Sequence, residues 1–257
     1  MLEKLYKFSN SWTGTIFIVL MIIFFVAQAF VIPSGSMKRT LLIGDHLFVK
    51  KFAYGIPTPH IPWLEIPVLP DFNGNGHLIS ADGPARGDIT VFRYPQNHKT
   101  HFVKRCVAVG GDSIQVIDKV LYLHPYEGDD YIKANYPKEN IIDRDGTLWV
   151  KAPYKINFAG VQNDDNIQNN GLYPPPIFNF PETLIKKDEY FMMGDNRDHS
   201  NDSRFWGAVP YELIEGTPWF IYFSWDKDYK IRWNRMGHFV DTLENDASYI
   251  DPDESLE

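Results

Sequence analysis

The sequence predicts a mostly β protein that follows one apolar N-terminal segment and carries an inserted lobe. Three observations support this fold class. No charged residue occurs between Lys7 and Lys38. After that gap, apolar and polar residues alternate with a period of two in stretches rich in β-branched and aromatic types, as strands require. A polar block then separates the first of these stretches from the last.

The apolar stretch at residues 12–32 predicts a transmembrane anchor, preceded by a short N-terminal segment, 1–11. As a helix, its 21 residues would reach about 31 Å, the thickness of a hydrocarbon core. The alternative is a removable secretory signal with Ala27-Gln28-Ala29 as its small-x-small cleavage site. A permanent anchor is favoured because the apolar run continues past that site to Ile32. Basic residues flank both ends, so charge does not settle the orientation.

The strand patterns predict a core built from two parts of the chain. Residues 33–112 and 188–240 would form this β core, and 113–187 would form the inserted lobe, because Pro, Gly and Asn interrupt its sequence. The individual patterns lie at 46–55, 88–94, 101–109, 113–123, 189–194, 218–225 and 230–233.

Charge is concentrated at the C-terminus. Of 33 acidic residues, seven lie in 241–257, which contains no Lys or Arg, so the rest of the chain has 26 acidic and 25 basic residues. We therefore expect 241–257 to be a solvated acidic tail. The nearly neutral body has no basic stripe of the kind that nucleic acid requires, so no nucleic acid partner is expected. The single cysteine, Cys106, excludes an internal disulfide.

Two stretches contain candidates for chemistry. The sequence "VIPSGSMKRTLLIGD" places Ser34 and Ser36 in a Pro- and Gly-containing turn just after the anchor. In the strand pattern 101–109, Lys104 shares a face with Phe102 and Cys106. Burial there would lower the pKa of the lysine and make it a competent general base. The alternatives are an ordinary turn and a lysine whose ammonium group reaches water.

A third stretch, "MGDNRDHSNDSRFWG" at 193–207, aligns Ser200, Asp202 and Arg204 on one side if it is extended. A polar turn is the simple alternative. A calcium loop is the other, because Asp198 begins a 1-3-5 spacing of oxygen ligands. Positions 6 and 12 of such a loop hold serine and valine instead of glycine and glutamate, so no metal is expected.

Together these motifs resemble the type I signal peptidases. "PSGSM…TLLIGD", "VKRCVAVGGD" preceded by "ARGDITVFRYP", and "MGDNRDHSNDSRFWG" occur in the family's order and cover most of 32–112 and 188–235. The resemblance implies a membrane-anchored serine endopeptidase with a Ser/Lys dyad and a largely antiparallel β catalytic domain. It would remove signal peptides from exported preproteins after small-x-small sites, without a cofactor. It would be a single-pass protein of the bacterial inner membrane, with its catalytic domain on the extracytoplasmic side.

The resemblance also implies a role for individual residues. Ser36 matches the nucleophile and Lys104 its general base. The supporting residues are Ser200, which orients the lysine, the ion pair of Asp202 and Arg204, and Ser34, whose hydroxyl completes an oxyanion hole with the Ser36 N–H. Five apolar residues match the walls of shallow pockets for small side chains at substrate positions −1 and −3; the alternative is that they are ordinary core. They are Ile32, Met37, Leu41, Leu47 and Val103.

The chain departs from the family pattern at two loops. Arg39 stands where proline is usual, and Val109-Gly110 replaces Leu-Pro, so the conformation of both loops is open.

A Ser-His-Asp hydrolase is a rival because His98, His101 and His199 lie near the motifs. It lacks a Gly-x-Ser-x-Gly nucleophile elbow. A rival outside enzymology is a tethered binding module of the cell envelope. The lipid bilayer is an expected partner, through the anchor and the Trp-rich stretches 61–70 and 217–225, which could instead be core.

Overall fold

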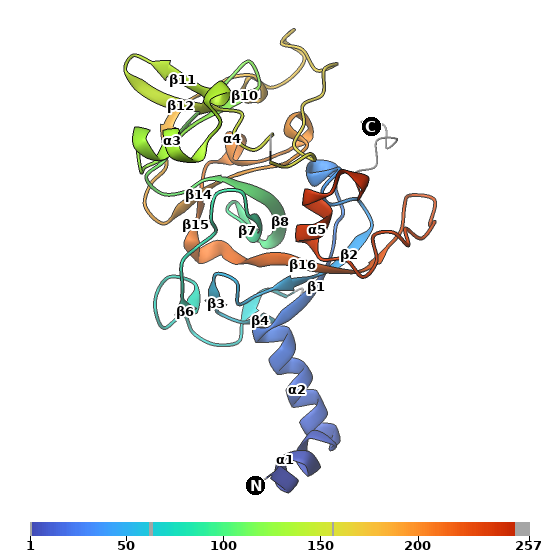
Figure 1. The fold of residues 1–257 in the computed structure, drawn as a ribbon. Coiled ribbons are helices and arrows are strands. Elements are labelled where there is room, and N and C mark those ends of the chain that lie inside the picture. Colours follow the sequence, from blue (N-terminus) through green and yellow to red (C-terminus); the bar gives the residue numbers. More distant parts are fainter. Residues whose placement is uncertain (1, 62–63, 156, 250–257) are drawn as a thin grey trace.

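A computed structural model describes residues 2–61, 64–155 and 157–249 and consists mostly of antiparallel β-sheet (Figure 1). This confirms the mostly β, antiparallel part of the predicted fold class. Every pair of named strands is antiparallel. The larger sheet has the strand order β1 (Ala27–Val31), β2 (Asp45–Lys50), β16 (Ile214–Ser224), β7 (Ile89–Tyr94), β8 (Asn97–Ala108), β14 (Glu189–Met193) and β15 (Val209–Pro210).

The second sheet comes from the middle of the chain. Its order is β11 (Ile141–Arg144), β12 (Thr147–Lys151), β10 (Val120–His124), β9 (Ser113–Ile117) and β13 (Phe180–Leu184). Two short pairs, β3 (Gly55–Pro57) with β6 (His77–Ser80) and β4 (His60–Ile61) with β5 (Ile66–Pro67), lie in the Pro- and Gly-rich region before β7. The helices are α1 (Leu2–Ser9), α2 (Trp12–Phe25), α3 (Asp129–Asn135), α4 (Ser203–Trp206) and α5 (Val240–Asn245), with short 3-10 turns η1 (Gly35–Met37), η2 (Lys138–Asn140), η3 (Pro175–Ile177), η4 (Arg197–His199), η5 (Tyr211–Leu213) and η6 (Ala247–Tyr249).

The apolar N-terminal stretch divides into a helix and a strand. Ser11 caps α2 by accepting a hydrogen bond from the Gly14 N–H at 3.1 Å, and the helix ends at Phe25. The expectation of one helix over 12–32 is therefore wrong, because the backbone of β1 pairs with β2 in the larger sheet. No helix in the described ranges is long and apolar enough to cross a membrane.

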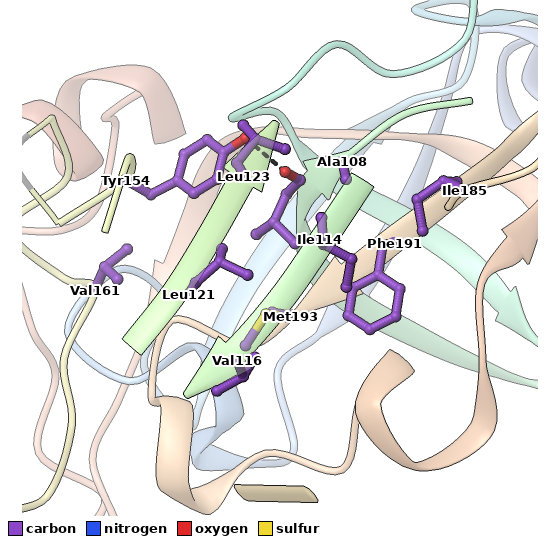
Figure 2. Close-up of a cluster of buried hydrophobic side chains, with 11 residues drawn as sticks. Ala108, Ile114, Val116, Leu121, Leu123, Tyr154, Val161, Ile185, Phe191 and Met193 are labelled. Carbon is purple, nitrogen blue, oxygen red and sulfur yellow. Dashed lines mark hydrogen bonds between the residues drawn. The ribbon is translucent and has the colours of Figure 1, made fainter. Parts of the chain in front are cut away.

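The two large sheets share one hydrophobic core (Figure 2). β8 and β14 contribute Val107 and Phe191, and β9 and β10 contribute Ile114 and Leu123. The Tyr154 hydroxyl closes this core by donating to the Val107 carbonyl at 2.7 Å. The second sheet is thus packed against the larger sheet through this core.

The expected acidic tail is partly a structured helix. Val240 and Leu243 of α5 are buried in a second apolar cluster with Met37 and Leu41. Within 241–249 the side chain of Leu243 is buried, whereas those of Asp241, Thr242, Asn245, Asp246 and Ser248 are exposed. Residues 250–257 lie outside the described ranges. The expected strand at 230–233 is reduced to one bridge between Trp225 and Ile231.

Candidate functional site

Ser36 lies in the short turn η1, immediately after the turn at Pro33 that ends the extended N-terminal segment. Asn196 holds this turn from the opposite side. Its backbone N–H donates to the Ser36 carbonyl and its side-chain amide donates to the Gly35 carbonyl, each at 3.1 Å. Arg39 follows with φ of 75°, which proline cannot adopt because its ring fixes φ near about −65°. The loop after Ser36 therefore differs from one that contains proline at this position.

Lys104 reaches Ser36 from β8, where it pairs with Thr90 of β7. Its Nζ lies 2.6 Å from Ser36 Oγ and donates to the Val103 carbonyl at 2.9 Å. Ser36 is 7% exposed and Lys104 is 4% exposed. Burial lowers the pKa of Lys104 to about 8, although the Asp202 and Asp195 carboxylates oppose this shift. An amine with this pKa is neutral in a useful fraction of molecules near neutral pH.

A buried ion pair, formed by Asp202 and Arg204, lies near Lys104. Arg204 contacts Asp202 through two hydrogen bonds, Nε to Oδ1 at 2.8 Å and Nη2 to Oδ2 at 2.9 Å. Asp202 also accepts from the Gly194 N–H at 3.1 Å, and Arg204 donates to the Arg197 carbonyl. Burial alone would raise the pKa of Asp202, but the Arg204 charge holds it below the usual range. The pair therefore stays ionised.

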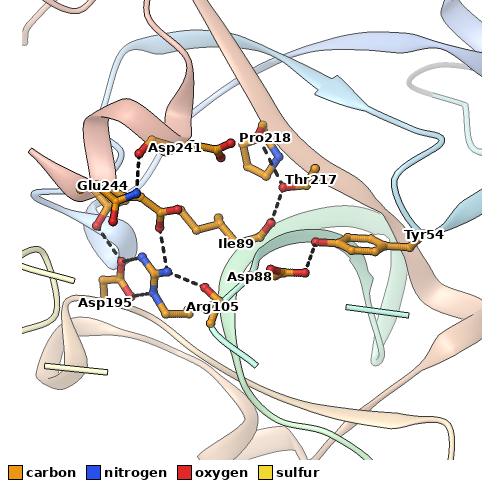
Figure 3. A network of polar contacts seen from close by, with 12 residues as sticks. Tyr54, Asp88, Ile89, Arg105, Asp195, Thr217, Pro218, Asp241 and Glu244 are labelled. Atoms are coloured by element: carbon orange, nitrogen blue, oxygen red, sulfur yellow. Dashed lines mark hydrogen bonds and ion pairs between the residues drawn. The ribbon is translucent and has the colours of Figure 1, made fainter. Parts of the chain in front are cut away.

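A second buried pair was not predicted from the sequence. Arg105 Nε lies 2.8 Å from Asp195 Oδ1, and Arg105 Nη2 lies 2.7 Å from Asp195 Oδ2 (Figure 3). Thr40 donates to the same carboxylate at 2.6 Å. Asp195 directly precedes Asn196, so this pair fixes the segment that holds the Ser36 turn. The available signal was an arginine on an apolar strand, which requires a carboxylate partner when it is buried.

Ser200 and Ser34 take different positions. The Ser200 hydroxyl is buried and makes no hydrogen bond within the described residues. A Cβ atom at Gly194 would lie 2.4 Å from Ser200 Oγ and 2.5 Å from the Ser36 carbonyl oxygen, so only glycine fits between them. Ser34 is exposed at the start of η1 and makes no capping hydrogen bond there. The structure thus brings Ser36 and Ser200 together at Gly194, and Lys104 contacts Ser36 from β8.

The five apolar candidates for pocket walls are mainly core side chains in this structure. They belong to or border the apolar cluster that also contains Val240 and Leu243 of α5. Ile32, Met37, Leu41 and Leu47 are buried, and Val103 is partly buried at the edge of the cluster.

The histidines near the motifs have other partners. His199 Nε2 lies 3.0 Å from Asp164, and His101 Nε2 lies 3.9 Å from Glu65. Cys106 is fully buried, which raises the pKa of its thiol well above the usual range. Among the described residues, no group of three or more His, Cys, Asp or Glu is arranged to hold a metal ion.

A serine hydroxyl in contact with a buried amine is an arrangement that can activate the serine as a nucleophile. A sequence model of the family described as "Signal peptidase, peptidase S26" matches residues 5–225. The chain therefore belongs to this signal peptidase family and is a serine endopeptidase.

Two sequence relatives named signal peptidase I agree with this assignment. A signal peptidase I of Helicobacter pylori (strain J99) is 44% identical over 277 aligned residues, which cover 95% of this chain and 96% of the relative. A signal peptidase I of Rickettsia typhi is 35% identical over 235 residues, covering 85% and 82% of the two chains. A solved signal peptidase I of Enterococcus faecalis V583 aligns with a TM-score of 0.29 and 24% identity, over 54% of this chain and 98% of the other.

Proposed function

We propose that this protein removes signal peptides from exported preproteins, with Ser36 as nucleophile and Lys104 as general base. The observation that carries the proposal is the 2.6 Å contact between Ser36 Oγ and a buried lysine whose pKa is lowered to about 8. A serine hydroxyl becomes an effective nucleophile when an adjacent base removes its proton. A lysine can serve as this base only when its amine is neutral.

The reaction proceeds in two halves. Neutral Lys104 takes the Ser36 proton as Oγ attacks the carbonyl carbon of substrate residue −1. The tetrahedral intermediate collapses, the peptide bond breaks, and the Lys104 ammonium protonates the departing amine of the mature chain. A water molecule then attacks the acyl ester while Lys104 accepts its proton, and Ser36 is released with the signal peptide as a free acid.

The surrounding residues serve this dyad. The Ser36 N–H and the Ser34 hydroxyl stabilise the oxyanion, a contribution of about 3–4 kcal/mol per donor in comparable enzymes. The Ser200 hydroxyl, which has no hydrogen-bond partner among the described residues, is available to orient the Lys104 amine, and the ion pair of Asp202 and Arg204 keeps the segment around Ser200 in place. Support comes from the buried, bidentate geometry of that ion pair and from the position of Ser200 against Gly194.

Specificity for small side chains at positions −1 and −3 is the finer part of the proposal. Of the five apolar candidates next to Ser36, Val103 at the edge of the cluster is the partly exposed one, and it offers the accessible surface for these side chains.

We further propose that α2 anchors the protein in the bacterial inner membrane, with the catalytic domain on the extracytoplasmic side. Figure 1 shows α2 projecting from the body, and large apolar side chains on it are exposed, including Trp12, Ile16 and Phe17. An apolar helix of this kind needs an apolar environment. Exposed aromatic side chains near β16, such as Trp219 and Trp233, would lie at the interface of the bilayer.

The test is a cleavage assay with the purified full-length protein in detergent and a preprotein with an Ala-x-Ala site. We expect one new N-terminus after the second alanine, identified by mass spectrometry, and no product with Ser36→Ala. Retained cleavage by Ser36→Ala would refute the nucleophile assignment. Binding of the preprotein without cleavage by the wild type would favour a tethered binding module instead.

A further inference from the structure

Helix α5 lies beyond the part of the chain that the family's sequence model matches, which ends at residue 225. It nevertheless packs directly behind the Ser36 turn. Val240 and Leu243 are buried in the same apolar cluster as Met37 and Leu41, and Met37 is the residue next to Ser36. The C-terminal helix is therefore part of the structural support of the candidate active site.

Glu244 of α5 joins a chain of polar contacts that leads to Ser36. Its Oε2 lies 2.8 Å from Arg105 Nη1, and Arg105 forms the bidentate pair with Asp195 (Figure 3). Asn196, the next residue, donates to the carbonyls of Gly35 and Ser36. Three side chains thus separate α5 from the backbone of the nucleophile.

The charges show why Glu244 matters to this arrangement. Arg105 is fully buried, and its guanidinium remains charged at any physiological pH. Asp195 takes Nε and Nη2, whereas Nη1 has the Gly87 carbonyl at 2.6 Å and the Glu244 carboxylate. Glu244 is itself only 13% exposed. Without Glu244, Nη1 keeps only the Gly87 carbonyl, so one edge of a buried cation loses its charged partner while Asp195 alone holds the other edge.

We propose that Glu244 is a positioning residue that fixes the Ser36 turn through Arg105 and Asp195. It acts at a distance and contacts no substrate. The inference rests on the proposed function, because its effect is read in cleavage by Ser36. Its consequence is that the C-terminal helix, a part of the chain outside the matched family region, sets the geometry of the catalytic dyad.

The first experiment compares steady-state cleavage by wild type, Glu244→Ala, Glu244→Gln and Asp241→Ala in detergent. Asp241 provides the matched control because its carboxylate is on the same helix and exposed. We expect Glu244→Ala to lower kcat about tenfold or more with KM little changed, since small displacements of catalytic groups cost up to about a hundredfold. Glu244→Gln keeps a hydrogen bond to Arg105 and should recover part of kcat. Asp241→Ala should stay within about twofold of wild type.

Thermal unfolding of the same proteins separates positioning from loss of fold. The proposal is supported if Glu244→Ala is folded at the assay temperature and still has low kcat. It is overturned if kcat of the folded variant equals that of wild type, or if Asp241→Ala loses as much kcat as Glu244→Ala.

A double-mutant cycle tests the route of the effect. Thr40→Val removes the contact of Thr40 with Asp195, so its effect on kcat and that of Glu244→Ala should be less than multiplicative if both act on Asp195. Fully multiplicative effects would overturn the proposed route. Wild type and Ser36→Ala are measured in parallel: a wild type without activity, or an active Ser36→Ala, would count against the proposed function and not against the role of Glu244.

Discussion

The lowered pKa of Lys104 leads to a quantitative prediction of the pH profile. With a pKa of about 8, about 9% of the free enzyme holds a neutral lysine at pH 7 and about 91% at pH 9. The value of kcat/KM should therefore rise about tenfold between these pH values, because this parameter reports the free enzyme. A lysine exposed to water has a pKa of about 10.4, so burial disfavours the charged form of Lys104 by about 3 kcal/mol.

The substitution Asp202→Asn tests whether the charges around Lys104 contribute to its pKa. The Asp202 carboxylate raises the pKa of Lys104 against the effect of burial, and its removal also leaves the Arg204 charge unneutralised nearby. Both changes disfavour a protonated lysine, so the acid limb should move to lower pH, whatever happens to the maximal rate.

The assay is preprotein cleavage at low substrate concentration from pH 5 to pH 10, with constant ionic strength. If Lys104 is the base, the acid limb of the kcat/KM profile lies near pH 8 in wild type and at lower pH in Asp202→Asn. A limb near about pH 6.5 that disappears when His101 and His199 are replaced would identify a histidine base and refute the reasoning.

Three further outcomes follow from the site. Lys104→Ala and the double variant with Ser36→Ala should lose cleavage to the same extent as Ser36→Ala alone, because the two residues act as a unit; additive losses would contradict the dyad. Lys104→Met should abolish cleavage but stabilise the fold by about 3 kcal/mol more at pH 7 than above about pH 10.4, since it removes a buried group whose charged form is disfavoured. Because the folded pKa lies below the unfolded one, this gain should be complete below about pH 8 and vanish above about pH 10.4, which denaturant titrations at both pH values would check. Gly194→Ala should strongly reduce cleavage in a folded protein, because its Cβ would lie 2.4 Å from Ser200 Oγ and 2.5 Å from the Ser36 carbonyl oxygen. A variant with the kcat and KM of wild type would show instead that the backbone around Gly194 can shift to make room for the methyl group.

The apolar N-terminus shows the limit of local sequence patterns. An apolar run indicates burial or an apolar environment, but its composition alone does not separate helix from strand. The partner of β1 is Asp45–Lys50, and that pairing is a long-range property. The helix over 12–25 could therefore be predicted from the sequence, whereas the change to a strand at Ala27 could not.

The candidate site was predictable where strand alternation and motif agreed. The alternation of 101–109 placed Lys104 on an apolar face, and the resemblance joined it to a serine 68 positions earlier in the chain. Arg105 points to the other face, where its partner Asp195 is 90 positions away, so only the structure connects them. At the C-terminus, the count of acidic residues obscured the pair Val240 and Leu243, whose spacing of three is that of a helix face.

The junction of α2 and β1 makes the N-terminal region a spacer of fixed length. Only Val26 separates the helix from the strand, and the five residues of β1 span about 17 Å while hydrogen-bonded to β2. Ser36 follows five positions after the end of β1. The distance between Ser36 and a membrane surface at α2 would therefore vary little. If α2 lies in the membrane as proposed, a substrate bond reaches Ser36 only when the apolar segment before it ends at the matching depth.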